Sequence, residues 1–370
     1  MTVIKKEQKK VEAKLKKWIK SDPRRIRILA ELMVAIPLSR SVQGNDLAAN
    51  IIRQVQDQSI QQMLRRFYKN EAITWEVFYA PLVREVLKSL KVGLYYLVMD
   101  TTKVGAKHRA VTLSLAYKNR SLPLVWQIEP GCKGHSKEKV QVELLKKIYP
   151  YLPQCKPVIF LGDSEFDGVL VQRQLRQQGW FYVIRTAPKY YIYADKEAPG
   201  VCLASLVPQV NAPAQTRQQV YFTTKHQFGP VDCFACWEDP YDEPLVLIAH
   251  LPQTWPFSIR NTYDPRFWTE PLFGDCKEAG FRLSETRLTL PERLSRLFLA
   301  VSASYLWMFW LGSQVIIHKQ LAQVDRSNRR TLSVFKLGWR WFKQQLKFGL
   351  LVPFSLDFSD SFVLPSLKFT

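Results

Sequence analysis

Residues 158–168 read VIFLGDSEFDG, an apolar run followed by three acidic residues. The run 158–161 is short, rich in β-branched and aromatic residues, and ended by a glycine, which predicts a strand buried on both faces. In open α/β sheets, ligands bind just beyond the carboxyl ends of such strands. Asp163 therefore occupies a predicted functional position, although Asp, Ser and Gly are also typical of simple turns.

The sequence on both sides of this run alternates between strand and helix patterns. Period-2 alternation predicts strands, at residues 93–100, 109–119, 122–130, 157–163 and 180–186. Apolar residues at three- and four-residue spacing predict helices, at 136–152 and 168–179. The resulting order β-β-β-α-β-α-β predicts a mixed α/β core that begins with an antiparallel meander.

The rest of the chain falls into regions of different pattern. Residues 1–90 have Lys-rich helical periodicity. Their short helices with a glycine-containing turn are typical of helix-turn-helix DNA-binding modules, although many helical bundles share this pattern. Residues 91–187 form the α/β core. Residues 188–255 contain prolines and short alternating runs, which predict a β-rich insertion. Residues 256–290 return to helical spacing, and residues 291–370 predict a C-terminal helical region with an extended tail.

The composition indicates a polyanionic partner. Lys and Arg number 53 against 32 Asp and Glu, which gives a formal net charge of +21. The cations are spread along the whole chain, which favours nucleic acid over a membrane surface. A merely basic surface is the alternative. The Lys-rich start has no apolar core of a signal peptide, so we expect a reducing, cytoplasmic setting.

Two further patterns resemble a zinc site and a membrane span, and we expect neither. Cys233 and Cys236 form one CxxC, but a zinc site needs a second pair or spaced histidines, and the stretch resembles a strand. The segment 297–317 is long enough to span a membrane. Serine, glycine and glutamine residues dilute it, and a helix that is apolar all round also occurs in the core of large proteins. We therefore expect a core helix and no membrane partner.

Three carboxylates are the best candidates for chemistry. Asp100 and Asp163 each end an apolar strand, and Glu270 lies in a later helical segment. Carboxylates brought together raise one another's pKa, and divalent cations remove that cost. Oxygen ligands suit Mg²⁺ or Mn²⁺, and two such ions can activate water and stabilise a leaving oxygen in phosphodiester chemistry. The sequence thus predicts a two-ion site within a basic protein.

The surroundings of Glu270 add cations to this site. Tyr263, Arg266, Glu270 and Lys277 follow one another at fixed spacing. On one continuous helix, the last three would share a face, where the two cations could contact phosphates beside a metal-bound carboxylate. The alternative is a surface ion pair between Arg266 and Glu270, which would occupy the carboxylate.

The Y-R-E-K spacing resembles the signature of the IS-four family of DDE insertion-sequence transposases. The stretches VMDTT, RSLPLVW, FLGDSEF and 280–307 match that family in the same order. The resemblance implies an RNase H-like fold whose catalytic core comprises residues 91–187 and 256–290. It implies Asp100, Asp163 and Glu270 as the metal-binding catalytic triad. Tyr263, Arg266 and Lys277 would position DNA phosphates.

Two details of the resemblance concern other residues. Some members of the family hold a flipped base with a tryptophan of the insertion during a hairpin step, and this chain offers Trp237 and Trp255. The DSEFDG stretch departs from the Arg-Gly that usually follows the second Asp. It adds Glu165 and Asp167, which we rank below Asp163 because a strand end holds a ligand more rigidly than a turn.

The function implied is that of a bacterial, nucleoid-associated transposase. Such an enzyme cuts DNA at the terminal inverted repeats of its element and joins the 3′-hydroxyl to target DNA, with two Mg²⁺ or Mn²⁺ ions per site. Synapsis of two ends implies a homodimer. A nuclease that never joins strands is one alternative, and a non-catalytic DNA-binding regulator is the other.

Overall fold

The computed structural model describes residues 2–131, 134–326, 330–360 and 362. Six helices precede the first strand in this part of the chain: α1 (Val3–Trp18), α2 (Pro23–Ser39), α3 (Gly44–Ala48), α4 (Asp57–Lys69), α5 (Trp75–Phe78) and α6 (Ala80–Ser89). Local signals set their starts. At α2, the side chain of Asp22 accepts a hydrogen bond from the backbone N–H of Arg24, and Pro23 occupies the first helical position.

The core follows in the order expected from the sequence. Its elements are β1 (Tyr95–Val104), β2 (His108–Tyr117), β3 (Arg120–Pro130), α7 (Glu138–Ile148), β4 (Val158–Gly162), α8 (Val169–Gln177) and β5 (Phe181–Arg185). Strands β1, β2 and β3 form an antiparallel meander, β4 pairs in parallel with β1, and β5 pairs in parallel with β4. The expected β-β-β-α-β-α-β order is therefore confirmed. The expectation that the first strand ends at Asp100 is wrong, because pairing with β2 carries β1 on to Val104.

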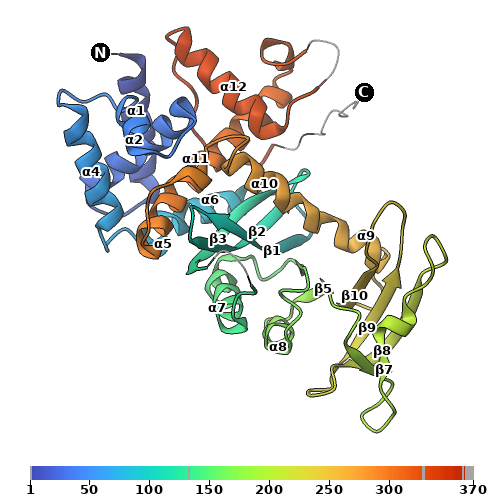
Figure 1. Ribbon diagram of the computed structural model, residues 1–370. Helices are drawn as coiled ribbons and strands as arrows, with labels where there is room; N and C mark the ends of the chain where they lie inside the picture. Colours follow the sequence, from blue (N-terminus) through green and yellow to red (C-terminus); the bar gives the residue numbers. More distant parts are fainter. Residues whose placement is uncertain (1, 132–133, 327–329, 361, 363–370) are drawn as a thin grey trace.

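The β-rich segment extends this same sheet. Its strands are β6 (Tyr191–Tyr193), β7 (Val201–Cys202), β8 (Gln215–Phe222), β9 (Phe228–Cys236) and β10 (Leu245–His250). Strand β10 pairs antiparallel with β5. Within the described residues this gives one ten-stranded sheet in the order β3-β2-β1-β4-β5-β10-β9-β8-β6-β7. Figure 1 shows the added strands projecting beyond the helix-covered core.

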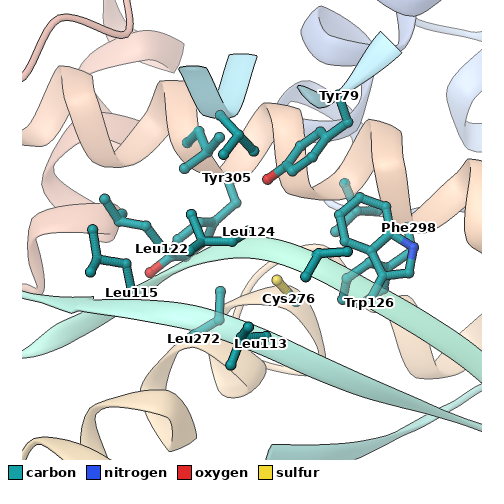
Figure 2. Packing of buried hydrophobic residues seen from close by; sticks show 14 of the residues in the cluster. Tyr79, Leu113, Leu115, Leu122, Leu124, Trp126, Leu272, Cys276, Phe298 and Tyr305 are labelled. Carbon is teal, nitrogen blue, oxygen red and sulfur yellow. The ribbon is translucent and has the colours of Figure 1, made fainter. Parts of the chain in front are cut away.

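Helices cover both faces of the core sheet. Figure 1 shows α7 and α8 on one face, and α10 and α11 with the N-terminal helices on the other. On the second face, the Trp126 ring lies 4.8 Å from the ring of Tyr79 and 4.9 Å from that of Phe298 (Figure 2). These aromatic side chains fix the N-terminal helices, the sheet and α11 to one another, because aromatic side chains bury large apolar areas.

A shared face for Arg266, Glu270 and Lys277 requires one continuous helix after β10, but the segment is not one helix. It comprises α9 (Ile259–Tyr263), a 3₁₀ turn (Asp264–Trp268) and α10 (Thr269–Cys276). Arg266 lies in the 3₁₀ turn, Glu270 in the first turn of α10, and Lys277 just beyond its end. The expected common face is therefore wrong for Lys277, because a 3₁₀ turn advances by a different angle and the helix stops first.

The long apolar segment is a core helix. Helix α11 (Pro291–Ile317) is long and apolar enough to cross a membrane, but 89% of its most apolar window is buried inside the protein. It crosses α12 (Val334–Lys347) at very short range. A Cβ added to Gly312 would lie 1.8 Å from the carbonyl oxygen of Val334, and one added to Gly338 would lie 1.9 Å from that of Met308. The two glycines thus permit backbone contact.

The described part of the tail is extended, as expected, and it is packed. Every second side chain of this segment is buried, as in an extended chain: Val352, Phe354, Leu356 and Phe358. The backbone N–H of Val352 donates to the buried carboxylate of Glu7 at 2.9 Å. This hydrogen bond joins the extended segment at Val352 to α1.

Candidate functional site

Two neighbouring strands bring the two predicted aspartates together. Val98 of β1 lies opposite Leu161 of the parallel strand β4. Asp100 and Asp163 each follow two residues later, so they lie level with each other where β4 ends. Parallel pairing with apolar residues on both faces fixes this register.

Arg266 connects these aspartates to Glu270. Its Nη2 atom lies 3.0 Å from a carboxylate oxygen of Asp163 and 3.5 Å from one of Asp100, and its Nη1 atom lies 3.1 Å from Glu270. One guanidinium therefore contacts all three carboxylates predicted to form the triad. The ion pair between Arg266 and Glu270 that we considered from the sequence is present, and it extends to both aspartates.

Burial differs strongly among these groups. The side chain of Arg266 is 12% exposed, that of Asp100 11%, and that of Glu270 62%. Burial raises the pKa of Asp100 to about 6, while the nearby Arg266 lowers it and Asp163 raises it. Asp100 therefore holds its charge near neutral pH with help from a neighbouring cation.

The side chains at this site fit divalent cations. No group of three His, Cys, Asp or Glu side chains in the described ranges is arranged to hold a metal ion directly. Here the three carboxylates gather around the guanidinium of Arg266. Carboxylate oxygens drawn from two strands and a helix are the donors that Mg²⁺ and Mn²⁺ prefer. Asp100, Asp163 and Glu270 can supply them once Arg266 moves aside.

Tyr263 and Lys277 lie elsewhere. Tyr263 is 1% exposed and packs in a small core with Val98 and Leu161, beneath the carboxylates. A direct phosphate contact by Tyr263 therefore requires its turn to shift. Lys277 is half-buried beyond the end of α10. The DNA-contacting roles of both residues stay predictions.

The two tryptophans of the insertion make internal contacts. The indole N–H of Trp237 donates to the backbone oxygen of Tyr241, and that of Trp255 donates to the hydroxyl of Thr262 on α9. Both rings are half-buried. Trp255 helps to hold α9 in place, and base stacking by either ring stays a prediction.

The CxxC pair lies on β9. Burial raises the pKa of Cys233 to about 12, so its thiol stays protonated. Cys233 and Cys236 are three positions apart on a strand and therefore point to opposite faces. This geometry does not suit two ligands of one metal ion.

The acidic residues after Asp163 serve different partners. One oxygen of Glu165 accepts hydrogen bonds from Thr101 and Ser136. Asp167 accepts one from Thr186 at 2.7 Å, and burial raises its pKa to about 6. Our sequence reasoning ranked both residues only as weaker metal ligands. The departure from the family pattern in DSEFDG was the one signal that could have pointed to another role.

In this mixed sheet, three carboxylates lie within β1, just beyond β4 and in the first turn of α10, which is the arrangement that the sequence predicts for a DDE triad. The sequence profile of the transposase DDE domain matches residues 97–307, more than half of the chain, so this chain belongs to that transposase family. The expected mixed α/β, RNase H-like fold is confirmed.

A solved structure shares the fold. It is a cryo-EM structure of the piggyBac transposase synaptic complex with hairpin DNA. The similarity has a TM-score of 0.50 at 10% sequence identity and covers 97% of this chain and 85% of the other. No curated protein sequence gives a significant match to this chain.

Proposed function

We propose that this transposase cuts DNA at the ends of its element and joins the freed 3′-hydroxyl to target DNA. One observation carries the proposal: Asp100, Asp163 and Glu270 converge on a single guanidinium, although they come from distant parts of the chain. Three carboxylates gathered at one point, with the pKa of Asp100 raised by burial, are typical of a functional site.

The residues of the site have separate roles in this proposal. Asp100, Asp163 and Glu270 hold two Mg²⁺ or Mn²⁺ ions, which when bound supply the activation of water and the stabilisation of the leaving oxygen. Arg266 keeps the carboxylates paired beforehand. It then turns to the DNA backbone, where its planar guanidinium can contact two phosphate oxygens.

The N-terminal helices supply a DNA-binding surface. A hollow of about 290 Å³ lies where α3 and α4 meet the chain between α10 and α11. Arg65 of α4 and Arg287 both line it and are exposed, and neither makes an ion pair or hydrogen bond within the described part of the chain. Two unpaired arginines at a junction suit a phosphate of bound DNA.

Further parts of the proposal rest on the resemblance and on the related fold. Membership of the IS-four group is supported by the Y-R-E-K spacing. A hairpin step is supported by the hairpin DNA in the piggyBac complex. A homodimer follows from the need to hold two ends together. We place the protein in the bacterial cytoplasm at the nucleoid, in line with its net charge of +21.

Cleavage and joining of a DNA duplex that ends in the element's terminal repeat test the proposal. Asp100→Asn, Asp163→Asn and Glu270→Gln should each abolish cleavage, because each removes a charged ligand. DNA affinity should stay within about threefold, since phosphate contacts by Lys and Arg dominate binding. Glu143→Gln, which alters an exposed carboxylate of α7 outside the triad, is the control and should cleave normally.

Different products separate the alternatives. Joined 3′ ends support transposition, and hydrolysis without any joining supports the nuclease. If Asp163→Asn cuts at the normal rate, Asp163 is not part of the triad. If the unaltered protein binds the terminal repeat but shows no cleavage with Mg²⁺ or Mn²⁺, the regulator is correct.

A further inference from the structure

One oxygen of Glu165 gathers three hydrogen-bond donors. Its Oε1 atom accepts from the Thr101 hydroxyl at 3.0 Å, from the backbone N–H of Ser136 at 2.8 Å, and from the Ser136 hydroxyl. Thr101 follows the catalytic Asp100 on β1, and Ser136 lies between β3 and α7. This single carboxylate therefore ties three chain segments together at the edge of the site.

Other buried groups hold the same segment. The Gln141 side chain, which is 0% exposed, donates to the backbone oxygen of Ser136 at 3.2 Å and to that of Glu165 at 3.1 Å. From β2, Arg109 donates to the backbone oxygen of His135 at 2.9 Å. The side chains of Glu165, Gln141 and Arg109 thus all hold residues 134–137 in place. Connecting loops are usually more mobile than this.

Glu165 is also linked to both aspartates. Its own backbone N–H donates to Asp163 at 2.9 Å. The backbone N–H of Thr101 donates to Asp100 at 2.8 Å. A shift of Glu165 would therefore reach Asp163 through one hydrogen bond, and Asp100 through two hydrogen bonds that meet at Thr101.

The fixed segment presents two nitrogen-bearing side chains to solvent. Ser136 is buried, whereas His135 and Lys137 on either side of it are exposed. Because Ser136 contacts Glu165, only two residues from Asp163, these exposed side chains lie at the rim of the site. A DNA strand whose phosphate reaches the three carboxylates comes near this rim.

We propose that Glu165 is a positioning residue that fastens residues 134–137 to both catalytic aspartates, so that Lys137 and His135 contact the DNA backbone beside the cleaved phosphate. This proposal rests on the function proposed above. Its rival is that Glu165 is a fourth metal ligand. Oε1 already serves three donors, and Arg266 pairs with the other three carboxylates but not with Glu165.

Comparison of Glu165→Gln with Glu165→Ala distinguishes the two roles. Glutamine keeps an acceptor oxygen for the three donors but loses the charge that a metal ligand needs. We expect Glu165→Gln to cleave within about threefold of the unaltered protein and Glu165→Ala to lose at least about tenfold in kcat. Glu143→Ala, which removes an exposed carboxylate of α7, is the control and should leave cleavage and kcat unchanged.

A measurement without catalysis keeps the proposal testable if the protein does not cut DNA. Hydrogen exchange should show that the Ser136 amide loses protection in Glu165→Ala and keeps it in Glu165→Gln. Titration with Mn²⁺ should give the same affinity for both variants. Weaker Mn²⁺ binding and lost cleavage in Glu165→Gln would overturn the proposal in favour of the fourth ligand.

A double-mutant cycle tests the link to DNA. Lys137→Ala should weaken DNA binding without changing Tm. If Glu165 acts through the loop, Lys137→Ala should reduce DNA affinity much less in the Glu165→Ala variant than in the unaltered protein. Additive losses would overturn the link. If Glu165→Ala does not fold, Ser136→Ala removes one donor while it keeps the carboxylate, and the same non-additivity is expected.

Discussion

Replacing Arg266 with alanine removes the cation that Asp100, Asp163 and Glu270 share. At an effective dielectric constant of about 20, an ion pair at 4 Å contributes about 4 kcal/mol before the cost of desolvation. Glu270 is 62% exposed and contributes little. The Asp100 side chain is largely buried, whereas that of Asp163 is 30% exposed. Removing one partner of a buried pair typically costs about 3–5 kcal/mol.

We therefore expect Arg266→Ala to lower the free energy of unfolding by about 3 kcal/mol at pH 7.5 without divalent ions. The loss should shrink at pH 5. The pKa of Asp100 is already raised to about 6 in the folded protein, above its unfolded value of about 3.8, and it rises further without Arg266. Protonation on acidification thus stabilises the variant relative to the unaltered protein.

Divalent ions should reverse this loss. With Arg266 gone, Mg²⁺ or Mn²⁺ can reach the carboxylates without displacing a guanidinium. Ions at 100 times their dissociation constant would stabilise the folded state by about 2.7 kcal/mol. Urea unfolding with and without Mg²⁺ measures the recovery, and titration with Mn²⁺ should show tighter binding to the variant than to the unaltered protein. Cleavage should still fall by orders of magnitude, because Arg266 no longer reaches the phosphate.

The matched control is Arg260→Ala. Arg260 lies on α9 and pairs with Glu238 and Asp264, outside the triad. Its loss should also lower stability, but Mg²⁺ should not restore it. The reasoning is refuted if Mg²⁺ restores both variants equally, or if Mn²⁺ binds Arg266→Ala no more tightly than the unaltered protein.

Two other features give direct tests. Replacing both Arg65 and Arg287 with alanine should reduce the slope of log K against log salt for DNA binding by about 1–2. Lys146→Ala, which alters an exposed cation of α7 outside the hollow, should reduce it less. In α12, Gly338→Ala places a Cβ 1.9 Å from a backbone oxygen of α11 and should lower the free energy of unfolding by about 3 kcal/mol or more in urea unfolding. By contrast, a Cβ at Gly274 on α10 meets open space, so Gly274→Ala should raise the free energy of unfolding by about 0.5–1 kcal/mol.

Local sequence patterns determined the order of strands and helices in the core. Period-2 and period-3.6 repeats of apolar residues depend only on neighbouring positions, so the strand that ends before Asp163 and the helices around it follow from the sequence alone. Those patterns did not show that the insertion extends the core sheet, since pairing of β10 with β5 depends on contacts between distant segments.

The three carboxylates could likewise be picked out as residues, because Asp100 and Asp163 each follow an apolar run and Glu270 belongs to a recognisable spacing. Their arrangement was not. The spacing of residues predicts the directions of their side chains only within one regular helix. The 3₁₀ turn at Arg266 breaks that regularity. Only tertiary packing of β1, β4 and α10 decided that Arg266 would lie among the three carboxylates and that Glu165 would bind backbone and hydroxyl groups, because each of these contacts joins segments far apart in sequence.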